Sequence, residues 1–192
     1  IIYSKGSDNI KIIDDNTVVV TTSDELKTAI SEDNGYTYIY LENDIMITSG
    51  FTINRNKEKI IVDGTYNGNK NTYTNNLSEA IDVINVNPTN KKVIFKNMNI
   101  VSSHSYGVIY VPSHPNYSNV VIEYNNINFN GIELSCNYYG VTKIVNSVIE
   151  VKEINGVQPQ RVCDSNRIIV DGKTTINSTS PTNTIFFLND VI

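Results

Sequence analysis

The chain has 192 residues, of which 40% are hydrophobic and 18% charged, and its formal net charge is −5. This length and apolar content are enough for a buried core and exclude a disordered chain. Positive residues form no stripe that could neutralise a phosphate backbone, and no apolar run approaches the roughly 20 residues of a membrane-spanning helix. We therefore expect neither nucleic acid nor membrane insertion.

Asparagine and isoleucine dominate the composition, with 29 Asn and 28 Ile against three Arg. Isoleucine favours half-buried positions on strands, and asparagine tolerates left-handed backbone and hydrogen-bonds to its own turn. The composition therefore favours short strands joined by asparagine-rich turns.

The first strong pattern along the chain predicts a helix. Thr22-Ser23-Asp24-Glu25 forms a capping box, in which the threonine caps the helix and the glutamate reaches back toward it. An apolar stripe of Leu26, Ala29 and Ile30 follows, and Asn34-Gly35 ends the helix. A short amphipathic helix ahead of a β-rich chain is suited to covering an open end of the fold.

Beyond the helix the chain contains an imperfect repeat, in which a short apolar strand closes with Asn or Asp. Five copies occur, and their closing residues are Asp63, Asn97, Asn125, Asn146 and Asp171. The steps between them are 34, 28, 21 and 25 residues. Such periods, with strands too short for a meander of hairpins, indicate an all-β solenoid whose coils stack in parallel. At the corners, Asn97, Asn125 and Asn146 are expected to occupy equivalent buried turns and to form an internal ladder.

We expect residues 1–192 to form one domain, with the N-terminal segment and cap helix in residues 1–37 and the stacked coils in residues 38–192. Because the chain begins at Ile1 without a methionine, we expect it to be a fragment of a larger protein. A β-sandwich remains the alternative fold, since Asp63-Gly64 and Asp171-Gly172 fit hairpin turns.

Three segments carry a resemblance to a known family. Residues 18–30, 38–45 and 60–64 resemble the cap helix, first coil and a following coil of the pectate lyase-like adhesive domains of bacterial surface proteins. The resemblance runs from about Val18 to the end of the chain. It implies a right-handed parallel β-helix in the extracellular space or on a bacterial cell surface, as one module of a longer adhesin, with no catalytic residues to transfer.

The side chains that polysaccharide cleavage needs are dispersed. A lyase needs clustered carboxylates for Ca²⁺ and a strong base, and a hydrolase needs paired carboxylates. No arginine is expected to stand beside two acids that share its face, and the candidate glutamates align poorly. These residues are Arg55, Arg161 and Arg167, and Glu123, Glu133, Glu150 and Glu153. We therefore predict no catalytic residue.

The remaining chemistry-bearing residues offer no recognisable site. His104 and His114 lie in segments that are typical of exposed loops. Cys136 and Cys163 permit at most one disulfide and lack the spacing of metal ligands, which favours two separate buried thiols. We expect no metal and no cofactor.

Tyrosines are the best binding candidates, because their rings stack on sugars and their hydroxyls bond to polar ligands. We predict Tyr110, Tyr124, Tyr138 and Tyr139 as ligand-binding, against the alternative that they pack in or on the solenoid. The sequence favours a non-catalytic, monomeric adhesive module whose ligand is a host or cell-wall glycan or a protein. A carbohydrate-active β-helix enzyme, either a polysaccharide lyase or a glycoside hydrolase, and a structural spacer remain alternatives.

Overall fold

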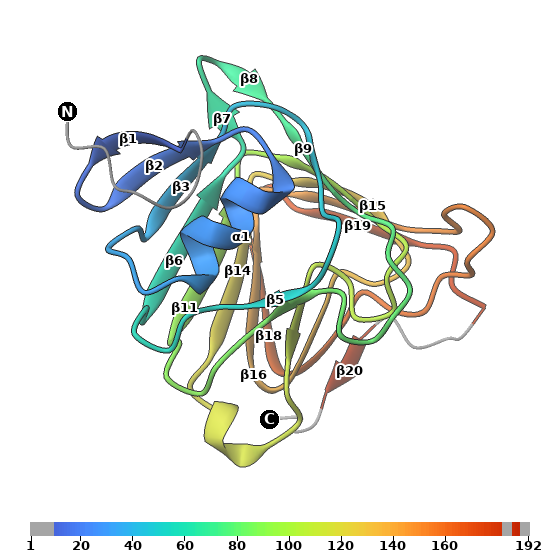
Figure 1. Cartoon of the computed structure of the whole chain (residues 1–192). Coiled ribbons are helices and arrows are strands. Elements are labelled where there is room, and N and C mark those ends of the chain that lie inside the picture. The colour runs from blue at the N-terminus through green and yellow to red at the C-terminus, as the bar shows by residue number, and fades with distance from the viewer. Residues whose placement is uncertain (1–9, 182–185, 189–192) are drawn as a thin grey trace.

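The computed structural model describes residues 10–181 and 186–188. Within them the protein is mostly β, with one α-helix, α1 (Ser23–Ser31), and one short 3₁₀ helix, η1 (Pro115–Tyr117). The prediction of an all-β chain with a short N-terminal helix is therefore confirmed. From β3 onward, each circuit of the chain adds one strand to each of three faces, which the chain visits in a fixed order (Figure 1).

The first face contains the strands of the sequence repeat, joined by two strands that precede it. Its members are β2 (Thr17–Val20), β3 (Tyr38–Leu41), β6 (Lys59–Asp63), β11 (Lys92–Lys96), β14 (Val121–Asn125) and the C-terminal halves of β16 (Ser135–Val145) and β18 (Cys163–Asp171). All neighbours in this face pair in parallel. The five repeat copies lie side by side, as their sequence similarity predicted.

The second and third faces are built from shorter strands, and their neighbours also pair in parallel. The second face holds β4 (Ile45–Met46), β9 (Thr72–Asn75), β12 (Asn99–Ser102), β15 (Asn128–Gly131), β17 (Val148–Val151) and β19 (Thr175–Ser178). The third face holds β5 (Phe51–Thr52), β10 (Ile84–Asn85), β13 (Ile109–Val111), the N-terminal halves of β16 and β18, and β20 (Phe186–Leu188).

Apart from two isolated bridges, Gly107 with Ser135 and Ile154 with Val157, antiparallel pairing in the described part of the chain is confined to two pairs of strands. β1 (Lys11–Asp14) pairs with β2 at the N-terminal edge of the first face, and β7 (Thr65–Tyr66) pairs with β8 (Asn69–Lys70). The second pair is a hairpin that projects from the stack, and its turn is Asn67-Gly68, both with positive φ. Because the three faces pair in parallel, the antiparallel sandwich considered from the sequence does not describe them.

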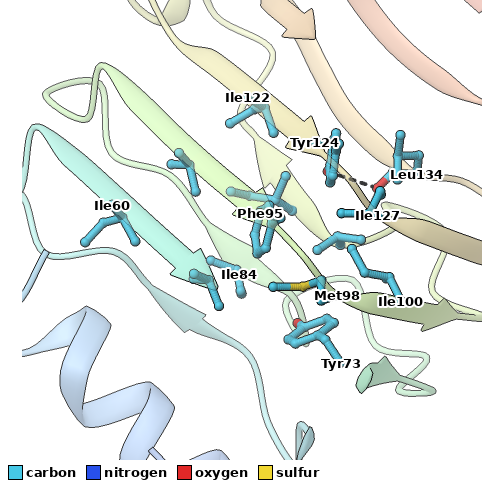
Figure 2. Packing of buried hydrophobic residues seen from close by; sticks show 14 of the residues in the cluster. Ile60, Tyr73, Ile84, Phe95, Met98, Ile100, Ile122, Tyr124, Ile127 and Leu134 are labelled. Atoms are coloured by element: carbon cyan, nitrogen blue, oxygen red, sulfur yellow. Dashed lines mark hydrogen bonds between the residues drawn. The ribbon is translucent and has the colours of Figure 1, made fainter. Parts of the chain in front are cut away.

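The space between the faces is filled by apolar side chains that form rows along the stack. Val62, Phe95, Tyr124 and Ile144 occupy the same position in successive strands of the first face, and all four are buried. The rings of Phe95 and Tyr124 stack with centroids 5.6 Å apart (Figure 2). The Tyr124 hydroxyl donates to the Leu134 carbonyl oxygen at 3.2 Å. Tyr124 has no exposed surface, so its ring packs in the core, which is the alternative to ligand binding that the sequence left open.

Helix α1 covers the N-terminal end of these rows, in front of the strands in Figure 1. Its buried stripe of Leu26, Ala29 and Ile30 joins the core. As predicted, the Thr22 side chain accepts a hydrogen bond from the Glu25 N–H, at 3.2 Å. The Glu25 carboxylate reaches one residue further back than a standard capping box and accepts the Thr21 N–H at 2.6 Å.

The corner between the first and second faces contains left-handed residues in successive coils, but one of them was misassigned from the sequence. Asn97, Asn126 and Asn146 have φ of 53°, 54° and 49°. Asn125 instead ends β14. The Asn126 side chain donates to the Asn97 side-chain oxygen at 2.9 Å, which is one rung of the predicted ladder. Asn97 is half-buried and the other two corner residues are exposed, so the expectation of a buried ladder is wrong.

Candidate functional site

The outer side of the third face carries a line of polar and aromatic side chains. Tyr110 lies opposite Cys136, and Cys136 lies opposite Asp164, in three successive strands. Their neighbours Ile109 and Cys163 belong to the buried core. Because side chains alternate between the two sides of a strand, Tyr110, Cys136 and Asp164 point away from that core.

Tyr106 extends this line at the side of Tyr110. The two rings stack with centroids 4.5 Å apart and an interplanar angle of 24°, and both residues are half-buried. His104 fixes the position of Tyr106, since its Nδ1 accepts the Tyr106 N–H at 3.0 Å. Its Nε2 lies 2.9 Å from the Glu79 carbonyl oxygen, to which it can therefore donate. His104 is fully buried, so the expectation of an exposed loop histidine is wrong, whereas His114 is exposed as expected.

The other predicted tyrosines occupy the bend between the third and first faces. Tyr138 and Tyr139 lie where the pairing of β16 with β18 is interrupted, between Asn137 and Val141. Their rings meet edge to face at 5.2 Å, and both are half-buried. The structure thus pairs the ring of Tyr138 with that of Tyr139, and the ring of Tyr110 with that of Tyr106.

An ionic cluster lies directly beside this line. Arg161 Nε is 2.5 Å from Asp164 Oδ1 and 3.8 Å from Glu133 Oε2. Glu133 is 1% exposed and Asp164 7%. The expectation that no arginine stands beside two acids is therefore wrong for Arg161. Asp164 is three residues from Arg161 in the sequence, whereas Glu133 is brought beside them only by the pairing of β16 with β18.

Burial controls the protonation of this cluster. It raises the pKa of Glu133 to about 9, an effect that Arg161 partly offsets and Asp164 reinforces. Burial also raises the pKa of Asp164, again against the influence of Arg161. Burial and the two nearby acids raise the pKa of the Cys136 thiol to about 12. At neutral pH the cluster therefore contains a protonated carboxyl group and an unreactive thiol.

Among the residues that the structure describes, the other acids and arginines that the sequence singled out form no comparable cluster. Glu123, on the first face, pairs with Lys92 at 2.8 Å, and Glu150, on the second face, pairs with Lys152 at 3.4 Å. Their positions on different faces agree with the poor alignment expected for these glutamates. Arg55 and Arg167 are exposed, and the two cysteines are free and buried, as predicted.

A second aromatic surface, on the first face, was missed from the sequence. Tyr38 and Tyr40 have centroids 4.8 Å apart, and Tyr40 and Tyr66 5.7 Å apart. The Lys96 ammonium lies 5.1 Å from the Tyr38 ring centroid, a cation–π distance. The Tyr38 hydroxyl donates to Asp63 at 2.8 Å, which ties this surface to the corner.

Residues 17–136 match the model of a family described as a "putative pectate lyase-like adhesive domain". The chain belongs to this family. The match begins where the sequence resemblance begins, but it ends at Cys136 rather than at the end of the chain. Arg161 and Asp164 therefore lie beyond the matched part of this pectate lyase-like adhesive domain. No curated protein and no solved structure matches the chain. Among the described residues, no helix is long and apolar enough to cross a membrane.

Proposed function

We propose that this chain is a non-catalytic adhesive module that binds glycans, displayed on the surface of a bacterium as one domain of a longer protein. In this proposal, residues 1–192 form a right-handed parallel β-helix in which residues 1–37 contribute the N-terminal segment and cap. The family supports adhesion, and the repeated parallel strands in three faces support the β-helix. The module acts outside the cell, where its ligands are host or cell-wall glycans.

The observation that carries glycan binding is the stacked pair of Tyr106 and Tyr110 on the outer side of the third face. Rings held on a rigid strand present a pre-formed apolar platform to a sugar, so little side-chain freedom is lost on binding. Asp164 lies two strands further along the same face, beyond Cys136, and together with Arg161 it offers hydrogen-bonding groups for sugar hydroxyls beyond the platform. Tyr138 and Tyr139 would extend the binding surface around the bend.

The test is a screen of the purified chain against immobilised host and bacterial cell-wall glycans, followed by calorimetry with each binder. Tyr110→Ala should weaken binding by about tenfold, because a lost aromatic contact costs on the order of 1.4 kcal/mol. Tyr40→Ala is the matched control, since it removes one ring of a similar pair on the first face. Equal loss in both variants, or binding that survives Tyr110→Ala, Tyr138→Ala and Tyr139→Ala, would place the ligand elsewhere.

Hydrolysis is the second candidate, and one observation favours it. Glu133 and Asp164 are neighbouring carboxyl groups, and the raised pKa of Glu133 is that of a general acid. The 1% exposure of Glu133 argues against direct contact with a substrate, which is why adhesion is preferred. Release of reducing ends from a glycan panel, abolished by Glu133→Gln, would reverse this preference. Unsaturated products from polygalacturonate with Ca²⁺ would instead indicate a lyase, and inertness in every binding and activity assay would leave a structural spacer.

A further inference from the structure

Glu133, Cys136 and Asp164 bring three potential metal ligands together beneath the outer surface of the third face. A carboxylate oxygen of each acid and the Cys136 Sγ all lie within 4.8 Å of one another. Cys136 and Asp164 are direct neighbours in the parallel pair of β16 and β18, and Glu133 precedes β16 by two residues. The three side chains are therefore held by the most extensively paired strands of the stack.

The buried carboxyl group of Glu133 lacks the hydrogen bonds that such a group normally receives. Neither of its oxygens accepts a hydrogen bond from the described residues. Its nearest described cation is Arg161, whose Nε is 3.8 Å away and closer to Asp164. Burying a polar group without hydrogen bonds destabilises a folded chain, so a ligand explains the packing around Glu133 better than stability does.

We propose that Glu133, Cys136 and Asp164 bind a divalent transition-metal ion of the zinc class. A thiolate with two carboxylates suits Zn²⁺ and related ions, whereas Ca²⁺ and Mg²⁺ prefer oxygen ligands throughout. Zinc bonds to sulfur and carboxylate oxygen are roughly 2.3 and 2.1 Å long, so ligand atoms up to 4.8 Å apart must move closer by side-chain rotation. On binding, the Cys136 thiol loses its proton to the solvent and the sulfur bonds to the metal.

Arg161 acts as the competitor for this site. Its guanidinium already supplies positive charge to both acids, and its side chain is 35% exposed, in the segment between β17 and β18. It can therefore swing into solvent when the metal binds. Removing its charge should strengthen metal binding, an effect that a purely structural ion pair does not produce.

The test uses the tag-free chain after treatment with a chelator and desalting, titrated with ZnCl₂ by calorimetry and with CoCl₂ by absorption spectroscopy. We expect one equivalent of either metal to bind and Co²⁺ to produce a near-ultraviolet sulfur-to-metal charge-transfer band. Cys136→Ser should abolish the band, and Cys136→Ser and Glu133→Gln should each weaken Zn²⁺ binding by at least about tenfold. Arg161→Gln should tighten it by about fivefold or more, the range of an electrostatic coupling of roughly 1 kcal/mol.

Two controls separate this site from other metal ligands. Cys163→Ser removes the second thiol, which belongs to the core, and His114→Ala removes an exposed histidine that could bind zinc adventitiously. Both should leave Zn²⁺ affinity and the cobalt band unchanged. The proposal is overturned if the wild-type chain gives no charge-transfer band, if Cys136→Ser retains it, or if Arg161→Gln binds Zn²⁺ no more tightly. Because the cobalt band is measured on wild-type protein, the test does not depend on every variant folding.

Discussion

Asp63 is the residue whose replacement should most clearly reveal how the corner of the first face is stabilised. It is 3% exposed, at the end of β6. Its Oδ1 accepts hydrogen bonds from the Thr65 N–H at 3.0 Å, the Thr65 hydroxyl at 2.8 Å and the Asn97 side chain at 3.1 Å. Its Oδ2 accepts from the Tyr38 hydroxyl at 2.8 Å and lies 3.2 Å from Lys96 Nζ.

Asp63→Ala leaves these donors and one lysine without their shared acceptor. Removing one partner of a buried charged pair costs about 3–5 kcal/mol, so we expect a loss in that range in the free energy of unfolding. Asp63→Asn keeps the Oδ1 acceptor and removes the charge, and should cost about 1–2 kcal/mol. Urea unfolding followed by circular dichroism measures both values.

Asp171 provides the matched control for Asp63. It occupies the equivalent position four strands further along the first face, but it is exposed. Asp171→Ala should therefore change the free energy of unfolding by less than about 0.5 kcal/mol. A loss at Asp63→Ala no larger than the loss at Asp171→Ala would refute the reasoning.

The stabilising effect of Asp63 should also depend on pH. Burial alone raises the pKa of Asp63, but hydrogen bonds from Thr65, Tyr38 and Asn97 outweigh it and hold the pKa below its usual 3.8. The unfolded chain then binds the proton more tightly than the folded chain, so this stabilisation is present above about pH 4 and is lost as the pH falls through the folded pKa. The difference between wild type and Asp63→Asn should accordingly shrink in acid.

Three further predictions concern the corner, the core and the thiols. Asn126→Ala should cost about 1–2 kcal/mol in urea unfolding, because alanine is unfavourable at a φ of 54°, whereas Asn125→Ala should cost less and Asn126→Gly should be tolerated. Tyr124→Ala should lower the free energy of unfolding by about 3–5 kcal/mol, and Tyr124→Phe by about 1 kcal/mol. Because Tyr124 is buried, any glycan that the chain binds should bind Tyr124→Phe with the affinity it has for wild type. Neither cysteine should react with a thiol reagent in the folded, metal-free protein at pH 8, because burial raises the pKa of both thiols. Both should react after unfolding. If either thiol of the folded protein reacts as fast as a free, exposed cysteine, the burial of that thiol is contradicted.

Much of the first face could be predicted because its strands are long enough to carry a sequence pattern that is recognisable in each copy. The five copies pair in parallel, in the order in which they occur in the sequence. The corner was displaced by one residue at Asn125-Asn126, because two adjacent asparagines satisfy the same pattern and only the backbone φ distinguishes them.

The burial of Tyr124 could have been inferred from the sequence. It follows Ile122 by two residues, and residues two apart on a strand point to the same side. Glu123 between them points outward, so Tyr124 had to point inward with Ile122.

The cluster around Arg161 lay beyond reach of the sequence for a different reason. Glu133 and Asp164 are separated in the sequence by β16, β17 and the irregular segment between β17 and β18. Their contact depends on the register between the N-terminal halves of β16 and β18, where only Ser135–Asn137 pair with Cys163–Ser165 before the bend. Paired segments of that length carry too little periodicity to fix a register.

The N-terminal edge of the first face has a consequence for how such modules can be joined. β1 runs antiparallel to β2 and its pairing is irregular between Ile12 and Asp14, while α1 covers the adjacent core. A strand from another copy could not pair with β2, because β1 already occupies the hydrogen-bonding groups along that edge. The irregular β1 is itself a poor template for continued pairing. Parallel pairing of a second copy onto β2 is therefore blocked by β1, so copies of this domain cannot extend the first face by adding a strand at β2.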